Sequence, residues 1–486
     1  MGLPTTGKDA MTRIIGTPPP PGAIVRAKLF DELRSFPPTD TGSAEAFSLL
    51  FAHRLKYDHS RKRWMVWNGL HWVPDANGEA QRAAIDTARW RVTAIWLQWP
   101  VGTDREDQRK IVEDSLQAQE WESVRGINAT LEVAKNLRSI ATVATDYDRD
   151  LFLLTVGNGT LNLRTGKLKP ADPEDLITHG PPIEYDPSAE CARWHQFLDE
   201  IFAGDSELIN FIQRAAGYSL TGDTREQCLF ILHGNGANGK STFVETFRKL
   251  LGSHATTTGF STFMVQRNVG APRDDLASLV DARLVITSEA GQGTTFDEAT
   301  VKLVTGQDAV SCRHLYGSFF EYVPQFKIWI TTNYKPTIYG SDDAIWRRIR
   351  LIPFNQQFKG NKRDAELPEK LKAELPGILA WAVQGCLDWQ RNGLGRPKTV
   401  LEATTEYRRE SDQVGRFLSE RCVSGKEHSV SGNALYNAYV QFSQLQGEKY
   451  LANNLFAAQI AKRHFEKKRT RRGLVYQGLG LQSKSG

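Results

Sequence analysis

Residues 228–252 read CLFILHGNGANGKSTFVETFRKLLG, and this stretch decides the fold. An apolar run at Cys228–Leu232 predicts a buried strand. The glycine-rich stretch that follows, Gly234–Ser241, fits the pattern G-x4-G-K-[ST]. Apolar residues then recur at helical spacing, at Phe243, Val244, Phe247 and Leu250. The sequence therefore predicts a strand, a phosphate-binding loop and a helix, in that order.

The loop has the residue types that hold a nucleoside triphosphate. Its glycines let the backbone turn N–H groups toward phosphate oxygens, and the following helix adds the positive end of its dipole. We expect Lys240 to reach the β- and γ-phosphates and the Ser241 hydroxyl to bind Mg²⁺. ATP and Mg²⁺ are therefore the expected substrate and cofactor. The predicted nucleotide-binding residues are Gly234, Gly236, Asn238, Gly239, Lys240, Ser241 and Thr242.

Two further apolar strands each end in a polar residue. ARLVITSEAG (282–291) ends at Ser288 and Glu289, and FKIWITTN (326–333) ends at Asn333. We expect the first strand to be a parallel neighbour of the strand before the loop, so that Glu289 activates the attacking water or binds the metal through water. Asn333 is expected to hold that water or to sense the γ-phosphate. The alternatives are an exposed acid and an ordinary turn residue.

Two adjacent arginines precede a short apolar strand in SDDAIWRRIRLIPF (341–354). An arginine that one subunit donates to the nucleotide site of the next stabilises the charge of the transition state. We expect either Arg347 or Arg348 to be this arginine finger. The alternative for each is a surface ion pair.

A β-hairpin is predicted between the strands that end at Glu289 and Asn333. Its strands are Val310–Tyr316 and Phe319–Val323, and its turn is Gly317-Ser318. Basic and aromatic residues on a projecting hairpin are suited to gripping a single nucleic-acid strand. The alternative is a purely structural hairpin. The residues predicted to contact DNA here are Arg313 and His314 at the tip and Lys302 on the preceding helix.

The positive charge is concentrated at the C-terminus. The net charge is +5, but the last 26 residues hold eight Lys or Arg against one acid, Glu466. The segment from about residue 412 predicts three helices, the last of them basic, and then short strands, which is the order of a winged helix. We expect the third helix to contact duplex phosphates. Docking of a partner protein and a solvated basic tail are the alternatives. The basic residues concerned are Lys467, Lys468, Arg469, Arg471 and Arg472.

The N-terminal part divides into a leader and a mixed α/β segment. Residues 1–40 contain proline runs and predict a flexible leader. Hairpins are predicted at Asn68-Gly69 and at Thr165-Gly166, with helices between them. We expect Trp64, Trp67 and Trp72 to pack across strands, although they could stack on bases. The acids Asp146, Asp148 and Asp150 are expected in a solvated loop, although paired carboxylates can also hold two metals.

The composition excludes several classes of protein. The chain has 486 residues, of which 40% are apolar and 24% charged, close to globular averages. We find no apolar run long enough to span a membrane and no secretory signal at the N-terminus. The five cysteines lie far apart in the sequence, so we expect reduced thiols. These features predict a protein of the cytoplasm, in the interior of a bacterial host cell.

The ordered segments GNGANGKST, RLVITSEA, KLVTGQDAVSCRHLYG, KIWITTN and WRRIRLIPF together resemble the superfamily-three helicases. The resemblance is to the helicase part of the phage and plasmid primase–poxvirus primase-helicase family, and it covers roughly residues 45 to 480. It implies an AAA+ type ATPase that assembles into a ring, usually a hexamer, around a DNA strand and moves 3′ to 5′. It also implies the roles given above for Lys240, Glu289, Asn333, for Arg347 or Arg348, and for the hairpin with Lys302.

The predicted fold class is α/β, with an AAA+ type P-loop ATPase core, an N-terminal α/β domain and a C-terminal winged-helix domain. The expected segments are a leader (1–40), the N-terminal domain (41–185), the helicase domain (186–360), a helical linker (361–404) and the basic domain (405–486). The chain leaves no room for a primase catalytic domain, so a separate primase is an expected partner.

The predicted function is ATP-dependent unwinding of DNA in phage, prophage or plasmid replication. The first alternative is an origin-binding or scaffold protein that uses ATP only to assemble a ring. The second is an ATPase that remodels proteins, which the basic residues of the hairpin and of the C-terminus disfavour.

Overall fold

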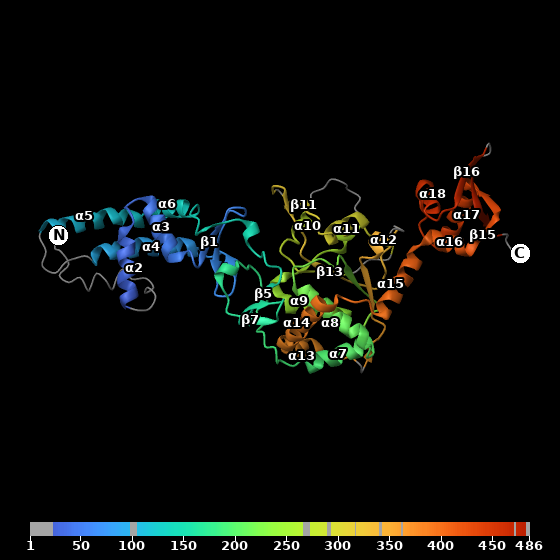
Figure 1. Ribbon diagram of the computed structural model, residues 1–486, viewed down its shortest axis with the longest axis horizontal. Coiled ribbons are helices and arrows are strands. Elements are labelled where there is room, and N and C mark those ends of the chain that lie inside the picture. Colours follow the sequence, from blue (N-terminus) through green and yellow to red (C-terminus); the bar gives the residue numbers. More distant parts are fainter. Residues whose placement is uncertain are drawn as a thin grey trace. The chain divides into compact units, whose positions relative to one another are not determined.

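The computed structural model describes residues 23–97, 105–265, 273–288, 293–315, 317–339, 343–360, 363–470 and 473–482. The chain divides into two compact units. Figure 1 shows the chain coloured by residue number. The first unit comprises Met1–Asn162 and Lys167–Glu184, and the second comprises Leu163–Gly166 and Tyr185–Gly486. Each unit is described separately.

The first unit begins with a helical layer. Its helices are α2 (Ala23–Ser35), α3 (Asp40–Phe51), α4 (Glu79–Trp96), α5 (Arg105–Gln119) and α6 (Val124–Ala134). Phe47 on α3 and Ala84 on α4 are buried in their shared core. The prediction of a flexible leader as far as residue 40 is wrong from Ala23 onward, because α2 occupies this segment and Leu33 packs in the same core.

Two small sheets complete the first unit. One has the strand order β3-β2-β1-β4, and the other β5-β6-β7. Both predicted hairpins are present, because Trp67 pairs with Trp72 and Asn162 pairs with Lys167. Trp72 is fully buried, so cross-strand packing of this tryptophan is confirmed. The strands are β1 (Leu55–Asp58), β2 (Arg63–Trp67), β3 (Trp72–Pro74), β4 (Ala141–Thr142), β5 (Leu153–Val156), β6 (Gly159–Asn162) and β7 (Lys167–Lys169).

The second unit is built on a five-stranded parallel sheet with the order β14-β8-β13-β10-β9. The sequence predicted that the strand ending at Ser288, β10, would be the direct neighbour of the strand before the loop, β8. This prediction is wrong, because β13 lies between β8 and β10. The strands are β8 (Leu229–His233), β9 (Ala255–Thr257), β10 (Leu284–Ser288), β13 (Lys327–Thr332) and β14 (Ile349–Pro353).

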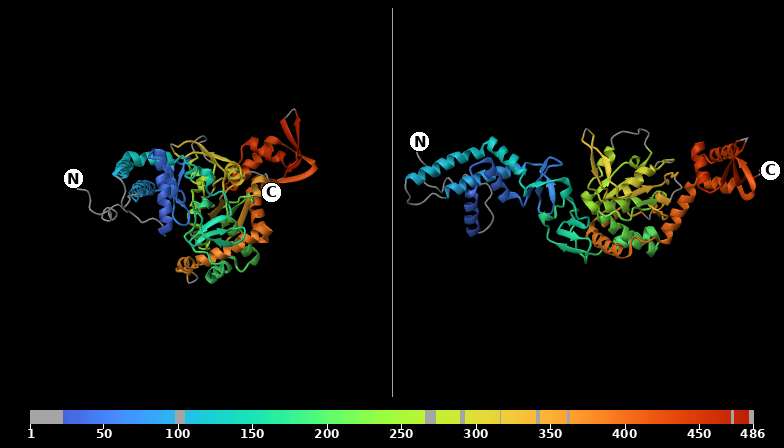
Figure 2. Two further views of the ribbon diagram at one scale, coloured as in Figure 1. Left: turned by 60° about the vertical axis from the view of Figure 1, so that its left-hand side comes forward. Right: turned by 45° about the horizontal axis from the view of Figure 1, so that its top comes forward.

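Both faces of this sheet are buried, as is usual for parallel sheets. One face is aliphatic and includes Ile231 and Ile330, which pack with Val301 of helix α11. The other face is aromatic: the Phe230 and Trp329 rings lie 4.5 Å apart, and Phe247 of helix α9 stacks on Trp329. Alternating side chains along each strand therefore hold helices on both sides, as Figure 1 and Figure 2 show.

Eight helices of the second unit accompany the sheet: α7 (Ala192–Phe202), α8 (Ser206–Leu220), α9 (Lys240–Leu251), α10 (Asp274–Ala277), α11 (Glu298–Thr305), α12 (Asp343–Trp346), α13 (Leu367–Ala373) and α14 (Leu375–Asn392). Helices α8 and α14 touch backbone to backbone. A Cβ on Gly217 would lie 2.0 Å from Cys386 N, and one on Gly385 would lie 2.0 Å from Gln213 O. The close contact therefore requires glycine at both positions.

The C-terminal part of the second unit contains three short helices and an antiparallel sheet of order β15-β17-β16. The predicted basic third helix is wrong. The third helix, α18, contains no Lys or Arg, and Lys467, Lys468 and Arg469 lie on the exposed strand β16. The elements are α16 (Gln413–Arg421), α17 (Gly432–Leu445), α18 (Asn453–Ala461), β15 (Cys422–Ser431), β16 (Glu466–Thr470) and β17 (Gly473–Leu481).

Helix α15 (Lys398–Ser411) lies between β14 and α16 in the chain and braces the segment between β13 and β14. The Tyr407 hydroxyl donates to Pro336 O, and its ring packs edge-on against Trp346 at 5.2 Å. Lys335 forms an ion pair with Glu410 at 2.6 Å. This segment is therefore fixed to α15 at several points.

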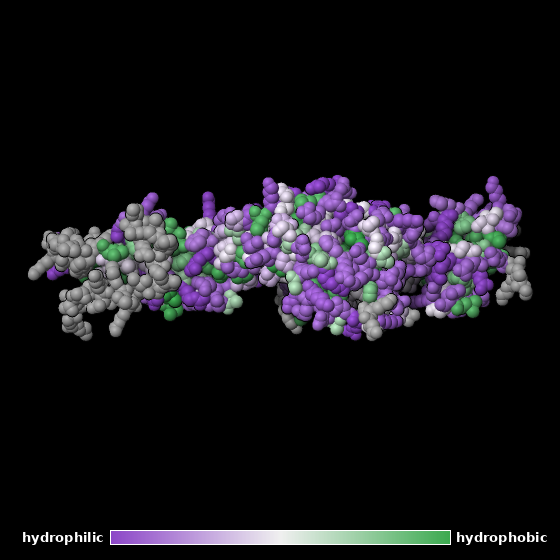
Figure 3. Space-filling model, turned by 90° about the horizontal axis from the view of Figure 1, so that it is seen from below, coloured by the Kyte–Doolittle hydropathy of each residue, from purple (hydrophilic) through white to green (hydrophobic). Residues whose placement is uncertain are grey.

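The surface is mostly hydrophilic on the face that Figure 3 shows, with small hydrophobic patches between polar side chains. Among the described helices, none combines the length and the apolar character that a bilayer crossing requires.

Candidate active site

The loop between β8 and α9 has the predicted strand–loop–helix form. A Cβ on Gly234 would lie 2.2 Å from Phe354 O, so this position admits only glycine. Gly239 has a φ of +88°, and a Cβ there would lie 2.8 Å from Ile201 Cγ2 on α7. Gly236 instead has open space where its Cβ would be. Packing therefore fixes both ends of the loop and leaves its middle open.

Lys240 is the first residue of α9, and its side chain turns back beneath the loop. Its Nζ donates to Gly234 O at 2.6 Å, to Asn238 Oδ1 at 3.1 Å and to Asn333 Oδ1 at 3.1 Å. Asn238 in turn donates to Phe354 O at 3.1 Å. Burial lowers the pKa of Lys240. The ammonium group is thus held by neutral oxygens in a partly dry site, where a phosphate can replace one of these partners.

An open cleft of about 950 Å³ lies over the loop. Ser241 and Thr242 line it at the start of α9, a helix whose N-cap, Gly239, provides no side-chain acceptor for the first N–H groups. These N–H groups and the helix dipole are therefore available to an anion. The residues present fit a bound triphosphate.

Asn333 meets Lys240 because β13 is the direct neighbour of β8. Thr332 pairs with His233, so the two strands end at the same level. The Thr332 hydroxyl accepts from Tyr334 N at 3.1 Å and donates to Tyr334 O at 2.6 Å, which forms the turn that exposes Asn333. Asn333 therefore lies at the loop, whereas its role at the γ-phosphate stays a prediction.

Ser288 also lines the cleft, at the end of β10. Glu289, the predicted catalytic acid and metal ligand, lies outside the described residues. Within the parts that the structure describes, no group of three or more His, Cys, Asp or Glu side chains could hold a metal ion.

The two candidate finger arginines differ in their surroundings. Arg348 is buried, and its guanidinium donates to Thr305 Oγ1 at 3.0 Å and to Ala344 O at 2.6 Å. Arg347 is exposed beside it. Both residues precede Ile349, which pairs with Leu229 at the start of β8. They therefore lie at the amino edge of the sheet, opposite the loop.

The predicted hairpin is present, with β11 (Val310–Cys312) paired antiparallel to β12 (Phe320–Tyr322). The Arg313 guanidinium lies over the Phe319 ring at 4.8 Å, and Phe319 is 68% exposed. Asp274 Oδ1 accepts from Leu315 N at 3.1 Å and lies 3.3 Å from His314 Nδ1. The tip therefore presents basic and aromatic side chains in a fixed arrangement.

The remaining candidate DNA contacts are dispersed. Lys302 lies on α11 and pairs with Glu298 at 3.8 Å. Lys467, Lys468 and Arg469 are exposed on β16, whereas Arg471 and Arg472 lie outside the described residues. None of these described residues lines the cleft.

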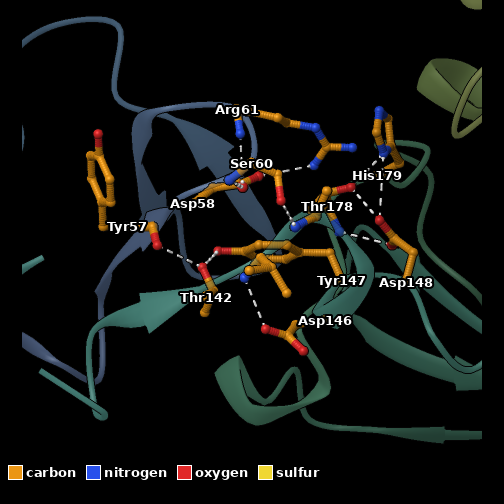
Figure 4. Close-up of polar contacts among 12 residues, drawn as sticks. Tyr57, Asp58, Ser60, Arg61, Thr142, Asp146, Tyr147, Asp148, Thr178 and His179 are labelled. Atoms are coloured by element: carbon orange, nitrogen blue, oxygen red, sulfur yellow. Dashed lines mark hydrogen bonds and ion pairs between the residues drawn. The ribbon is translucent and has the colours of Figure 1, made fainter. Parts of the chain in front are cut away.

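The three acids of the first unit have structural roles, and Figure 4 shows two of them, Asp146 and Asp148. Asp148 accepts from Thr178 N at 3.0 Å and from its hydroxyl, and Asp146 accepts from Val143 N at 2.9 Å. Asp150 accepts from Phe152 N at 3.0 Å. Because each carboxylate binds a nearby backbone N–H, these acids shape the loop. The loop was predicted to be solvated, but all three acids are partly buried.

Several cleft residues have no motif in the sequence. Arg193 and Glu200 on α7, together with Phe358 and Asp364, line the same cleft as the glycine loop and Asn333. They are up to 171 residues apart, counting from Arg193 to Asp364, and only the fold brings them together. The helical spacing of apolar residues on α7 could have indicated its buried face, but it contains no signal for the partly buried residues that line the cleft.

Three family models match successive parts of the chain. The model described as D5 N terminal like matches residues 44–203, and the one described as Poxvirus D5 protein-like matches residues 409–478. The chain thus carries two D5-like regions. Between these regions, residues 232–348 of the D5-like chain match a family of unknown function (DUF5906).

Several proteins that are similar to the D5-like chain come from viruses. It is 28% identical over 300 residues to a "Putative helicase" of Acanthamoeba polyphaga mimivirus, which covers 57% of this chain and 31% of the relative. A "Putative helicase" of Frog virus 3 is 27% identical over 262 residues, 50% of this chain and 27% of the relative. "Primase D5" of Fowlpox virus is 29% identical over 145 residues, 29% and 18% of the two chains. The matched region is thus about a third or less of each relative's length.

A solved structure described as "The A form apo structure of NrS-1 C terminal region-CTR" superposes on the D5-like chain with a TM-score of 0.49 at 11% identity. The superposition covers 88% of this chain and 96% of that one.

Proposed function

We propose that the chain is an ATP-dependent DNA helicase that acts as a ring. The observation that carries this proposal is the convergence of Lys240 Nζ and Asn333 Oδ1, 3.1 Å apart, on the open cleft above a glycine loop. A loop of this kind with a cation and an amide at its edge suits the binding and hydrolysis of a nucleoside triphosphate. The names of the viral relatives agree with a helicase.

Each group at the cleft has a proposed role. Lys240 binds the β- and γ-phosphates, and the N–H groups at the start of α9 bind phosphate oxygens. Asn333, now in contact with Lys240, would move to the γ-phosphate or to the attacking water. Mg²⁺, held by Ser241 and through water by Glu289, would neutralise charge on the triphosphate. The roles of Glu289 and Mg²⁺ rest on the sequence.

The position of Arg347 supports a ring. A strand of five residues is about 16 Å long, so Arg347 at the start of β14 cannot reach the loop beyond the end of β8 in the same chain. Its guanidinium can complete only the site of another copy. We favour Arg347 over Arg348 as the finger, because the internal hydrogen bonds of Arg348 occupy it. A closed ring of head-to-tail contacts follows, with six subunits as the expected number.

DNA would contact two surfaces. The tip of the hairpin, with Arg313, His314 and Phe319, would hold a single strand in the ring. The C-terminal helices and sheet would act as a winged helix, in which the exposed strand β16 rather than the third helix contacts duplex phosphates. The expected setting is phage, prophage or plasmid replication in a bacterial cell, with a separate primase as a possible partner.

A strand-displacement assay on forked DNA tests this proposal. We expect the wild-type protein to unwind DNA only with ATP and Mg²⁺, and Lys240→Ala to abolish unwinding while duplex binding persists. ATP hydrolysis without strand displacement would favour the origin-binding or scaffold alternative. ATP hydrolysis that DNA does not stimulate would favour an ATPase acting on proteins.

A further inference from the structure

Besides the residues of the glycine loop, the cleft is lined by Arg193 on α7 and by Phe358, Asp364 and Leu367 on the segment that leads into α13. Arg193 Nη2 lies 3.8 Å from Asp364 Oδ2, so α7 and this segment meet at the cleft. We propose that this part of the cleft binds the nucleoside part of the nucleotide, with the base stacked on Phe358 and Arg193 donating to an acceptor on the nucleoside. This inference rests on the proposed function. It identifies Phe358 and Arg193 as the residues that recognise the nucleoside of the substrate.

Helix α7 places Arg193 about one helical turn from the residues that contact the glycine loop. Phe197 and Ile201 contact the loop at Gly239, where a Cβ would lie 3.2 Å from Phe197 Cε2 and 2.8 Å from Ile201 Cγ2. Arg193 precedes Phe197 by four residues, which is about 6 Å along a helix. A group one helical turn beyond the phosphate cradle lies beside the sugar and base of a bound nucleotide.

Phe358 is fixed to the loop from the other side. Its backbone N donates to Ala237 O at 2.7 Å, and Ala237 has a φ of +60° within the glycine loop. The Phe358 side chain is half-buried and lines the cleft. An aromatic ring that is held next to a phosphate loop and faces a cleft offers a stacking surface for a base.

Arg193 has a buried donor with no partner among the described residues. Its Nη2 lies 3.2 Å from Glu200 Oε2 and 3.8 Å from Asp364 Oδ2, but Nη1 is buried and forms no hydrogen bond with any described residue. The hydrogen bond with Lys370 lowers the pKa of Asp364, which keeps this carboxylate charged beside the guanidinium. A buried N–H without a partner costs free energy, so an acceptor from a ligand would remove that cost.

The test compares ATP with inorganic tripolyphosphate, which has phosphates and no nucleoside. We expect Phe358→Leu to raise the KM for ATP about tenfold while kcat changes less than about twofold, since stacking on an aromatic side chain has this magnitude. The inhibition constant of tripolyphosphate for the ATPase should be the same in Phe358→Leu as in the wild-type protein. Arg193→Gln should act in the same direction, and Phe358→Tyr should keep the wild-type KM.

Gln357→Ala is the matched control, because Gln357 is exposed next to Phe358 and does not line the cleft. If Phe358→Leu weakened the binding of ATP and of tripolyphosphate equally, the loop itself would be disturbed, and this result would overturn the inference. An unchanged KM for ATP would overturn it as well. Loss of ATP binding by the wild-type protein would instead remove the proposed function, as would normal ATP and tripolyphosphate binding by Lys240→Ala.

Discussion

Mixing two inactive variants tests whether Arg347 acts between subunits. Within one chain, about 16 Å of strand separates Arg347 from the loop, which exceeds the Debye length at physiological salt. Arg347 should therefore have no effect on its own site. As a finger in the neighbouring site it should contribute about 10³-fold or more to kcat. Arg347→Ala alone and Lys240→Ala alone should thus both lack ATPase activity.

An equal mixture of these variants should regain activity. A site works when a subunit with an intact loop, Arg347→Ala, receives the arginine of a Lys240→Ala neighbour. In a randomly mixed ring this occurs at about a quarter of the sites, so we expect about a quarter of wild-type ATPase activity. The assay is steady-state phosphate release after subunit exchange. Activity of Arg347→Ala alone, or no recovery on mixing, would refute an arginine acting between subunits.

Three further changes have defined outcomes. Arg348→Met should lower the free energy of unfolding in urea by about 2 kcal/mol, because it leaves buried acceptors unpaired; unchanged unfolding would contradict its buried role. Because burial lowers the pKa of Lys240, ATP affinity measured by titration should fall with rising pH before the usual lysine value of about 10.4, and a decline only above that value would count against it. Replacing Lys467, Lys468 and Arg469 by Ala should make the plot of log binding constant against log salt concentration less steep, by the amount expected for the loss of about three phosphate contacts. The sequence preference should not change. Binding isotherms of duplex DNA at several salt concentrations would measure both.

Local patterns predicted the parts of the site that are adjacent in sequence. The glycine loop, the hairpin around Arg313 and the polar ends of the strands follow from spacing and turn residues. The order of the strands could not be predicted in this way, because the pairing of β13 with β8 joins residues about a hundred positions apart. The part of the cleft that holds Arg193 and Phe358 depends on the same long-range packing.

The basic C-terminal segment shows why a local signal can mislead. Lys and Arg have high helix propensity, so the sequence around Lys467 resembles a continued helix. His464, however, has a φ of +61°, which ends the helical turn, and Lys467 pairs with Tyr476 in an antiparallel hairpin. Pairing with a partner strand overrode the local preference, which left the charges on an exposed strand.

The brace formed by α15 has one more consequence. Tyr407 and Glu410 anchor the stretch of chain whose beginning carries the amide that touches Lys240 and whose end carries Arg347. If neighbouring copies share their nucleotide sites, this stretch contributes to two sites, one in its own subunit and one in the neighbouring subunit. A substitution that loosens a single anchor would then slow hydrolysis at both sites, including the site of a neighbouring wild-type subunit.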